Sequence, residues 1–331
     1  MKQLILFALL IFISCKNSKT EEVKSTLTGD PILDQMTTDM MRNPDDPNTY
    51  FTRAKYLHNQ GFYDEATRDM AQAMKRDSTT IEYYHLLADI YMDYYQSDKA
   101  LNVMYKASLL EPKRIPTLLK LSETQYILKR YEPSVKTLNN VLKYDPQNAE
   151  AYFMLGLNFK EGGDIPRAIN SFQTAIDFDP ELIDGWLELG SILESQKDLR
   201  AIDYYNGAVN VAPENISALH SKAYFLQNHQ KETEAIEIYN QINKIDKDYK
   251  DAYLNKGILF LEAENLERAY EEFNILCNLH PTYHLGFYYR GIVNEMNKNI
   301  DAARADYQNC VNLKSDFKKG NDALNAIKEL Q

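Results

Sequence analysis

The sequence is poor in the residues that build linkers, disulfide frameworks and metal sites. It has 12 glycines, 11 prolines and 3 cysteines in 331 residues. With so little glycine and proline, little of the chain is expected to be flexible linker. Cys277 and Cys310 lie 33 residues apart, with no CxxC pair and no histidine at metal-ligand spacing, so we expect two small core residues. They can pair as a disulfide only if their Cα atoms lie within about 7 Å.

Positive charge is also in short supply. Lysine and arginine number 37 against 48 aspartates and glutamates, which gives a formal net charge of −11. This balance argues against nucleic acid or an anionic membrane surface as the main partner, because both are polyanions.

Motifs of enzymes and metal sites are absent from the sequence. It contains no HExxH, GxSxG or GxxxxGKS/T motif, no EF-hand loop and no zinc-ligand spacing. The six histidines are scattered, and Pro281 interrupts the helix that would align His280 with His284. We therefore expect no catalytic residues, no metal site and no cofactor, and we predict that the protein is not an enzyme.

A short apolar run begins the chain. It extends from Leu4 to Ile13, which is too short for a bilayer core of about 30 Å at about 1.5 Å per residue. Its length suits the apolar region of a secretory signal. The residues from Phe12 to Cys15 resemble the lipobox of bacterial lipoproteins, although Phe12 replaces the usual leucine. The resemblance implies removal of residues 1–14 and acylation of Cys15; an ordinary signal peptide and an uncleaved anchor are the alternatives.

In bacterial lipoproteins the residue after the acylated cysteine helps to determine whether the protein goes to the inner or the outer membrane. In lipoproteins of this kind an aspartate at that position resembles an inner-membrane retention signal, whereas this chain has Lys16. The resemblance therefore implies an outer-membrane lipoprotein of a bacterial cell envelope, with the side of the membrane left open. Residues 15–30 are polar and have no apolar period, so we expect a flexible tether.

A period of 34 residues organises the rest of the chain. Small residues recur at eight positions, bulky residues recur in phase about sixteen positions earlier, and prolines close several units. The small residues are Ala66, Ala100, Ser134, Ala168, Ala201, Ala235, Ala269 and Ala303; the bulky ones are Tyr50, Tyr84, Leu118, Tyr152, Trp186, Leu219, Tyr253 and Phe287. Trp186 and Ala201 are fifteen apart, so one residue is missing from the turn between the helices of the fifth unit.

The fourth unit fills every column of a known repeat. Its residues are Tyr152, Leu155, Gly156, Phe159, Ala168, Phe172, Ala175 and Pro180. They resemble the tetratricopeptide repeat, which reads Trp-x2-Leu-Gly-x2-Tyr, then Ala-x3-Phe-x2-Ala, then Pro. The third unit departs most, because Ser122, Gln125 and Ser134 occupy family columns. The resemblance covers residues 47–317.

This resemblance implies an all-α fold, a right-handed α-solenoid of about eight helical hairpins. A hairpin cannot bury its apolar face alone, so neighbouring hairpins must stack. Gly156 and Ala168 would let the two helices of one hairpin approach closely, and Ala175 would leave room for the next hairpin.

The ends of such a stack need caps. We expect an N-terminal capping helix within residues 31–46, started by Asp30 and Pro31 and carrying Ile32, Met36 and Met40. At the C-terminus we expect a capping helix within residues 318–331. Asn321 is its expected N-cap, and its apolar face is Ala323, Leu324, Ile327 and Leu330.

The family resemblance also implies where a partner lies, because the first helix of each hairpin lines the concave face in these proteins. The columns carried over to this chain contain eight acids against two lysines, Lys55 and Lys160. The predicted groove residues are Phe51, Lys55, Glu82, His85, Asp89, Glu123, Tyr126, Glu150, Phe153, Leu157, Leu187, Tyr224, Leu254 and Tyr288.

An acidic groove of this kind would repel the acidic C-terminal tails that some family members clamp. It suits a protein segment, extended or helical, that carries basic and apolar residues. The resemblance implies a lipid-anchored scaffold that brings proteins together in the cell envelope. The alternatives are a chaperone-like or substrate-binding module that holds exported polypeptides, and a surface on which the acids are merely solvated.

Overall fold

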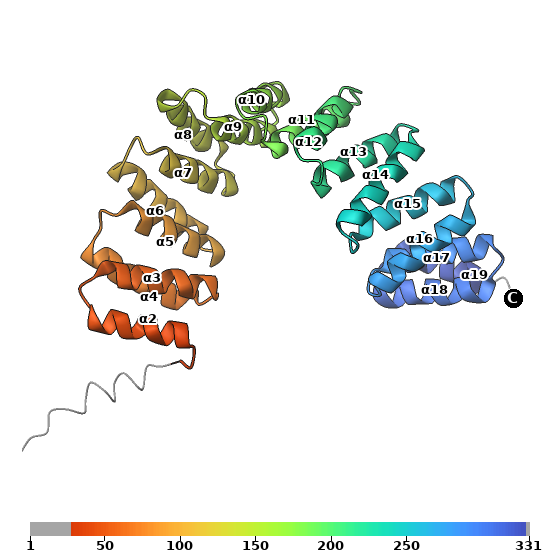
Figure 1. Cartoon of the computed structure of the whole chain (residues 1–331), viewed down its shortest axis with the longest axis horizontal. Coiled ribbons are helices and arrows are strands. Elements are labelled where there is room, and N and C mark those ends of the chain that lie inside the picture. Colours follow the sequence, from red (N-terminus) through yellow and green to blue (C-terminus); the bar gives the residue numbers. More distant parts are fainter. Residues whose placement is uncertain (1–27, 329–331) are drawn as a thin grey trace, which may run out of the picture. The chain divides into compact units, whose positions relative to one another are not determined.

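The computed structural model describes residues 28–328, and in this range it contains eighteen α-helices and no β-strand (Figure 1). The predicted signal peptide, Cys15 and most of the predicted tether lie outside the described residues. Among the helices that are described, none has the length and apolar character needed to cross a membrane.

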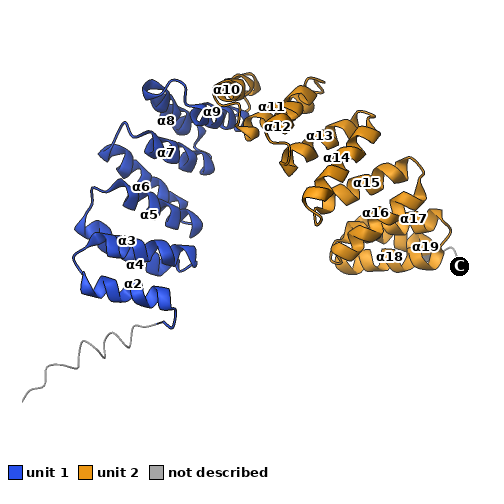
Figure 2. Ribbon diagram, in the orientation of Figure 1, with its two compact units in different colours: residues 1–162 blue, residues 163–331 orange. Residues whose placement is uncertain are grey.

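The chain divides after Gly162 into two compact units (Figure 2). Unit 1 contains α2 (Pro31–Arg42), α3 (Pro47–Asn59), α4 (Tyr63–Arg76), α5 (Ile81–Asp93), α6 (Ser97–Leu110), α7 (Ile115–Ile127), α8 (Tyr131–Tyr144) and α9 (Ala149–Glu161). Unit 2 contains α10 (Ile165–Phe178), α11 (Ile183–Ser195), α12 (Ala201–Val211), α13 (Ile216–Asn228), α14 (Glu232–Ile245), α15 (Lys250–Glu262), α16 (Leu266–Leu279), α17 (His284–Met296), α18 (Ile300–Leu313) and α19 (Lys318–Lys328).

The helices alternate in length as a repeat requires. The first helix of every hairpin, which we call its A helix, has 13 residues. The second, its B helix, has 14 residues in all hairpins except the fifth, where α12 has 11. This regular series confirms the predicted all-α solenoid of tetratricopeptide-type hairpins.

The turns between A and B helices show where the fifth repeat is one residue shorter than the others. Each turn places one residue in the left-handed backbone region: Gly61, Tyr95, Lys129, Gly163, Lys197, Gln230, Glu264 and Lys298. Lys197 is still in phase with the earlier turns, so the deletion falls between it and Ala201. The prediction of a shortened turn in the fifth unit is confirmed, and its structural result is that α12 loses its first helical turn.

Small residues bring the two helices of a hairpin together. A Cβ atom on Gly190 would lie 2.4 Å from Cε1 of Tyr205, and one on Gly257 would lie 2.4 Å from Cε1 of Phe273. In both hairpins an aromatic ring of the B helix occupies the space that an A-helix side chain would need. The same role for Gly156 stays a prediction, because its hairpin is divided between the two units.

Several of the bulky residues that recur once per repeat also form a hydrogen bond to the loop before their own hairpin. The Tyr84 hydroxyl donates to the Ser78 carbonyl at 2.8 Å, and Nε1 of Trp186 donates to the Pro180 carbonyl at 2.9 Å. Nδ2 of Asn321 makes the corresponding bond to the Ser315 carbonyl at 2.9 Å. Asn321 lies inside α19, because this helix begins at Lys318. The prediction that Asn321 is the N-cap is therefore wrong.

The two end helices bury apolar faces as expected, with one correction. At the C-terminus Leu324 and Ile327 are buried against α18, while Leu330 lies outside the described residues. At the N-terminus the Asp30 carboxylate caps α2 by accepting from the amides of residues 32 and 33. The buried face of α2 starts at Leu33, whereas Ile32 is 55% exposed, so the expectation that Ile32 belongs to the apolar face of this capping helix is wrong.

Candidate functional site

The predicted groove residues all lie on A helices, and in unit 1 these helices contact one another directly. The rings of Phe51 on α3 and Tyr83 on α5 are 5.1 Å apart between centroids. His58 Nε2 on α3 lies 2.7 Å from Asp93 Oδ2 on α5. We call the surface formed by α3, α5, α7 and α9 the A face of unit 1.

Two cations that were not among the predicted groove residues neutralise part of this face. Arg114, in the loop before α7, donates to the Glu82 carboxylate at 2.7 Å. Lys120 on α7 forms an ion pair with Asp89. Backbone amide donation at the start of α5 is the main cause that lowers the pKa of Glu82, and Arg114 adds to it. The acid surplus expected from the groove columns is therefore smaller in this part of the face.

His85 is held by a neutral partner. Its Nε2 lies 3.0 Å from the Thr117 hydroxyl on α7, and its side chain is half-buried. Burial lowers the pKa of His85, and the positive charges of Lys120 and Arg114 lower it further. His85 is therefore neutral at neutral pH, while Lys55 on α3 is an exposed cation at the same face.

Glu123 and Glu150 are the two predicted groove acids of this face that have no ion-pair partner among the described residues. The pKa of Glu150 is raised, chiefly because surrounding protein atoms desolvate its carboxyl group and then because Glu123 repels the ionised form. Glu123 and Glu150 lie on α7 and α9, two A helices that contact one another, and the charge of Glu123 adds to the rise in the pKa of Glu150.

Apolar side chains flank this carboxylate pair. Tyr126 follows Glu123 by one helical turn, and its ring lies 5.9 Å from that of Tyr131. Phe153 and Leu157 follow Glu150 along α9 and are half-buried. The arrangement offers negative charge beside partly open apolar surface, which suits a basic and apolar ligand.

A hollow of about 250 Å³ adjoins Glu123 between α5 and α7. Apolar atoms of Met92 and Ile127 contribute to its wall, and Ile127 is 50% exposed. The complete lining is Ala88, Asp89, Met92, Asp93, Lys120, Glu123, Thr124 and Ile127. It extends the acidic and apolar surface from the carboxylate pair toward the end of α5.

In unit 2 the predicted groove residues are less accessible. Leu187 and Leu254 pack on hydrophobic clusters formed mainly by their own hairpins. The ring of Tyr288 contacts those of Tyr307 and Phe317, at centroid distances of 6.2 and 5.2 Å. Tyr224 is 46% exposed and stacks on His220, so of these four residues it is the one on open surface.

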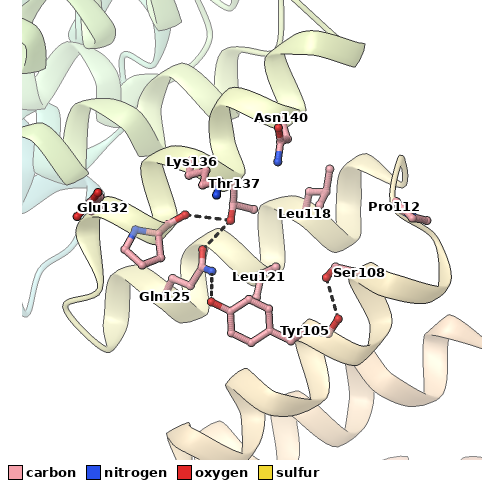
Figure 3. A pocket seen from close by; sticks show the side chains of 11 residues that line it. Tyr105, Ser108, Pro112, Leu118, Leu121, Gln125, Glu132, Lys136, Thr137 and Asn140 are labelled. Carbon is pink, nitrogen blue, oxygen red and sulfur yellow. Dashed lines mark hydrogen bonds between the residues drawn. The ribbon is translucent and has the colours of Figure 1, made fainter.

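A larger hollow, of about 650 Å³, lies between α6, α7 and α8 (Figure 3). It lies where the second hairpin meets the third, and the departure of Gln125 in the third hairpin from the repeat pattern is its signal in the sequence. Nε2 of Gln125 donates to the Tyr105 hydroxyl, and the Thr137 hydroxyl donates to Oε1 of Gln125, both at 2.9 Å. These polar groups satisfy one another, so the hollow presents no free polar group from this network.

The described residues contain no group of three or more histidine, cysteine, aspartate or glutamate side chains able to hold a metal ion. Cys277 and Cys310 are both buried and unpaired. Burial raises the pKa of the Cys277 thiol to about 12 and that of Cys310 to about 11.

Comparison with known proteins points to one repeat family. The tetratricopeptide repeat family matches residues 128–181 and 153–218. A curated relative, anaphase-promoting complex subunit 3 of Dictyostelium discoideum, is 25% identical over 81 residues, which is 24% of this chain and 8% of that protein. The chain therefore matches only a small part of that relative.

Two solved structures share the fold over most of the chain. The C-terminal part of a tetratricopeptide repeat-containing protein from Cytophaga hutchinsonii is 15% identical with a TM-score of 0.61, covering 74% of this chain and 99% of that one. A chain of the APC/C hetero-tetramer Cut9–Hcn1 is 14% identical with a TM-score of 0.50, covering 93% of this chain and 58% of that one. The sequence match and the shared fold together support a tetratricopeptide-repeat protein.

Proposed function

We propose that the protein is a lipid-anchored scaffold of a bacterial cell envelope that binds a segment of another protein on the A face of unit 1. The observation that carries this proposal is the Glu123–Glu150 pair. Glu123 contributes to the raised pKa of Glu150, and neither acid forms an ion pair with any of the described residues. A basic side chain from a partner would relieve this repulsion.

The surroundings of the pair define the partner further. Tyr126, Phe153 and Leu157 offer apolar contacts next to the two acids, and the hollow at Met92 and Ile127 continues the surface. Apolar contacts supply most of the affinity of such an interface, whereas complementary charges select the partner and speed its capture. The partner segment therefore carries basic residues interleaved with apolar ones, and binding rather than catalysis is the activity.

The anchor is proposed from the sequence alone. Phe12 to Cys15 resembles a lipobox, and Lys16 follows the cysteine. Multiple acyl chains hold a protein firmly at a membrane, while a single chain gives only marginal attachment. The proposed location is the outer membrane, with the polar residues 15–30 as the tether between lipid and solenoid.

In-cell crosslinking followed by mass spectrometry would identify the partner. Its affinity is then measured at low and high salt for the wild type and for the double variant Glu123→Lys, Glu150→Lys. We expect the variant to bind at least tenfold more weakly and to lose most of the salt dependence, because salt screens exposed charge pairs.

A matched control reverses two acids on B helices. Asp177 on α10 and Glu237 on α14 are both exposed, so the variant Asp177→Lys, Glu237→Lys changes the net charge by the same amount. It should leave partner affinity unchanged. If it weakens binding as much as the A-face pair does, the partner does not bind at Glu123 and Glu150. Capture of many unrelated chains without a fixed stoichiometry would contradict the scaffold function itself.

A further inference from the structure

A cluster of aromatic rings and one carboxylate lies in unit 2, at the junction of α13, α14 and α15. The ring of His220 on α13 is 6.3 Å from that of Tyr224, 6.0 Å from that of Tyr239 and 5.7 Å from that of Tyr249. Tyr239 is fully buried and forms the floor, whereas Tyr224 is 46% exposed and forms an outer wall. We call these four residues with Asp251 the ring cluster.

Hydrogen bonds fix the rings before any ligand arrives. Asn255 Nδ2 donates to the Tyr239 hydroxyl at 3.0 Å and lies 3.4 Å from Nε2 of His220. The Tyr239 hydroxyl in turn donates to Oε1 of Gln227 at 3.0 Å. The inner rings are therefore preorganised, and a ligand would not have to order them at an entropic cost.

The carboxylate of Asp251 has no charged partner in the described chain. Asp251 precedes Asn255 by one turn of α15, so it lies on the helix face from which Asn255 reaches the Tyr239 hydroxyl and His220. Its charge also opposes deprotonation of His220, Tyr239 and Tyr249 and so raises their pKa values. The neighbouring cation Lys250 places its Nζ over the ring of Tyr283 instead, at 4.9 Å from the centroid. Burial lowers the pKa of His220, so its imidazole is neutral at neutral pH and does not cancel the charge of Asp251.

The position of Asp251 in the first turn of α15 would by itself favour an acid, because the helix dipole is positive there. That effect does not account for the histidine ring and three tyrosine rings that cluster at the same junction of helices. Aromatic faces beside an unpaired carboxylate match one kind of ligand group. A guanidinium plane stacks on such rings and pairs with a carboxylate at its edge.

We propose that the ring cluster is a subsite for an arginine side chain of a bound polypeptide, with the guanidinium against Tyr224 and His220 and its charge paired with Asp251. The proposal rests on the proposed function only in taking the ligand to be a polypeptide. The ring cluster belongs to unit 2 and its chemistry is independent of Glu123 and Glu150.

The subsite can be tested with a small probe. The full-length chain, labelled with carbon-13 in its tyrosine and histidine rings, is titrated with N-acetylarginine methylamide. The comparison compound is N-acetylcitrulline methylamide, which has nearly the same shape and no charge. We expect saturable shifts of the Tyr224 and His220 resonances with the arginine compound, and at least tenfold weaker binding of the citrulline compound. Equal shifts from both compounds would overturn the proposal.

Variants assign the effect to the carboxylate. Asp251→Asn should weaken binding of the arginine compound at least tenfold, while the Tyr239 resonance in the absence of ligand reports that the fold is intact. Asp184→Asn is the matched control, because Asp184 occupies the first turn of α11 as Asp251 does in α15. If Asp251→Asn binds as tightly as Asp184→Asn, no cation subsite exists. If arginine binding depends on Asp251 but partner binding does not require Glu123 and Glu150, the arginine subsite stands. The proposed binding site on the A face of unit 1 is then rejected.

Discussion

Arg290 on α17 and Asp306 on α18 form a two-pronged ion pair inside the last hairpin. Nε and Nη2 of the arginine donate to the two carboxylate oxygens at 3.0 and 2.7 Å, and the aspartate side chain is only 5% exposed. Nη1 of the same arginine donates to Asn274, sixteen residues earlier on α16. Arg53 repeats the arrangement in the first hairpin, with Asp69 on α4 and Thr37 on α2.

Removing one member of the buried pair is expected to destabilise the protein strongly. Asp306→Ala leaves the Arg290 guanidinium buried without its counter-charge, which costs about 3–5 kcal/mol of unfolding free energy. Replacing both residues, as Arg290→Met with Asp306→Leu, should recover most of that loss. Chemical denaturation of the three proteins gives the comparison, and a double variant as unstable as the single one would contradict the explanation.

Because Gly190 lies so close to Tyr205, we predict that replacing this glycine by alanine destabilises the protein. A glycine-to-alanine change inside a helix normally stabilises it by up to about 1 kcal/mol. Here the new Cβ would meet the Tyr205 ring, whose hydroxyl is held by Glu194 at 2.6 Å. We expect Gly190→Ala to lower the unfolding free energy by about 1–3 kcal/mol. The neighbouring exposed position supplies the control, since Ser191→Ala should change it by less than about 0.5 kcal/mol.

The raised pKa of Glu150 predicts a pH effect on stability with a definite sign. Because the pKa of Glu150 is raised in the folded state, the folded protein holds that proton more tightly than the unfolded chain. The stability from this group is fully present below the unfolded pKa and is lost as the pH rises through the folded pKa. Glu123→Gln should lower the pKa of Glu150, as measured by carbon-13 NMR of the carboxyl group. Glu132→Gln, on α8, should not; an unchanged pKa in the first variant would show that the two acids do not interact.

Both described thiols should resist modification in the native protein. Burial keeps Cys277 and Cys310 protonated at mildly alkaline pH, and only the thiolate is nucleophilic. In a Cys15→Ala background, a disulfide reagent should react slowly with the folded chain and release two equivalents of chromophore after denaturation. Rapid reaction of either thiol, or a mass lower by two hydrogens, would show that the buried and unpaired state is wrong.

Cys15→Ala tests the proposed anchor. The variant should leave the membrane fraction or accumulate as an uncleaved precursor, because it has no thiol to acylate. Cell fractionation and intact mass measurement distinguish these results. A processed variant that remains with the membrane like the wild type would remove the basis for the lipoprotein proposal.

The repeat architecture could be read from the sequence because its signal is local and periodic. Columns of small and bulky residues fix the helices, their lengths and the position of the shortened fifth hairpin. The charge balance on the A face could not be read in the same way. Arg114 belongs to a loop outside the repeat columns, and its contact with Glu82 depends on how adjacent hairpins stack.

The end helices show the second limit of the sequence. Asparagine is a good N-cap in general, which favoured Asn321, but the repeat register places that residue within α19, where its amide binds the preceding loop. Ile32 likewise fits an apolar pattern and is nonetheless exposed, because Leu33 and Thr37 lie on the face that α3 and Arg53 contact. In both cases tertiary register overrides a local preference.

The polar bonds of Thr37 and Asn321 show that α2 takes the place of a B helix and α19 that of an A helix. The series of described helices therefore has half a period at each end. Excising or duplicating any whole 34-residue period would leave each terminal helix beside the same kind of neighbour, since each repeat in such a stack contacts only the repeats next to it. Excising a single helix would instead leave an unmatched apolar face. The length of this protein is therefore adjustable in whole periods, and the reach of the array can change without altering how its ends are sealed.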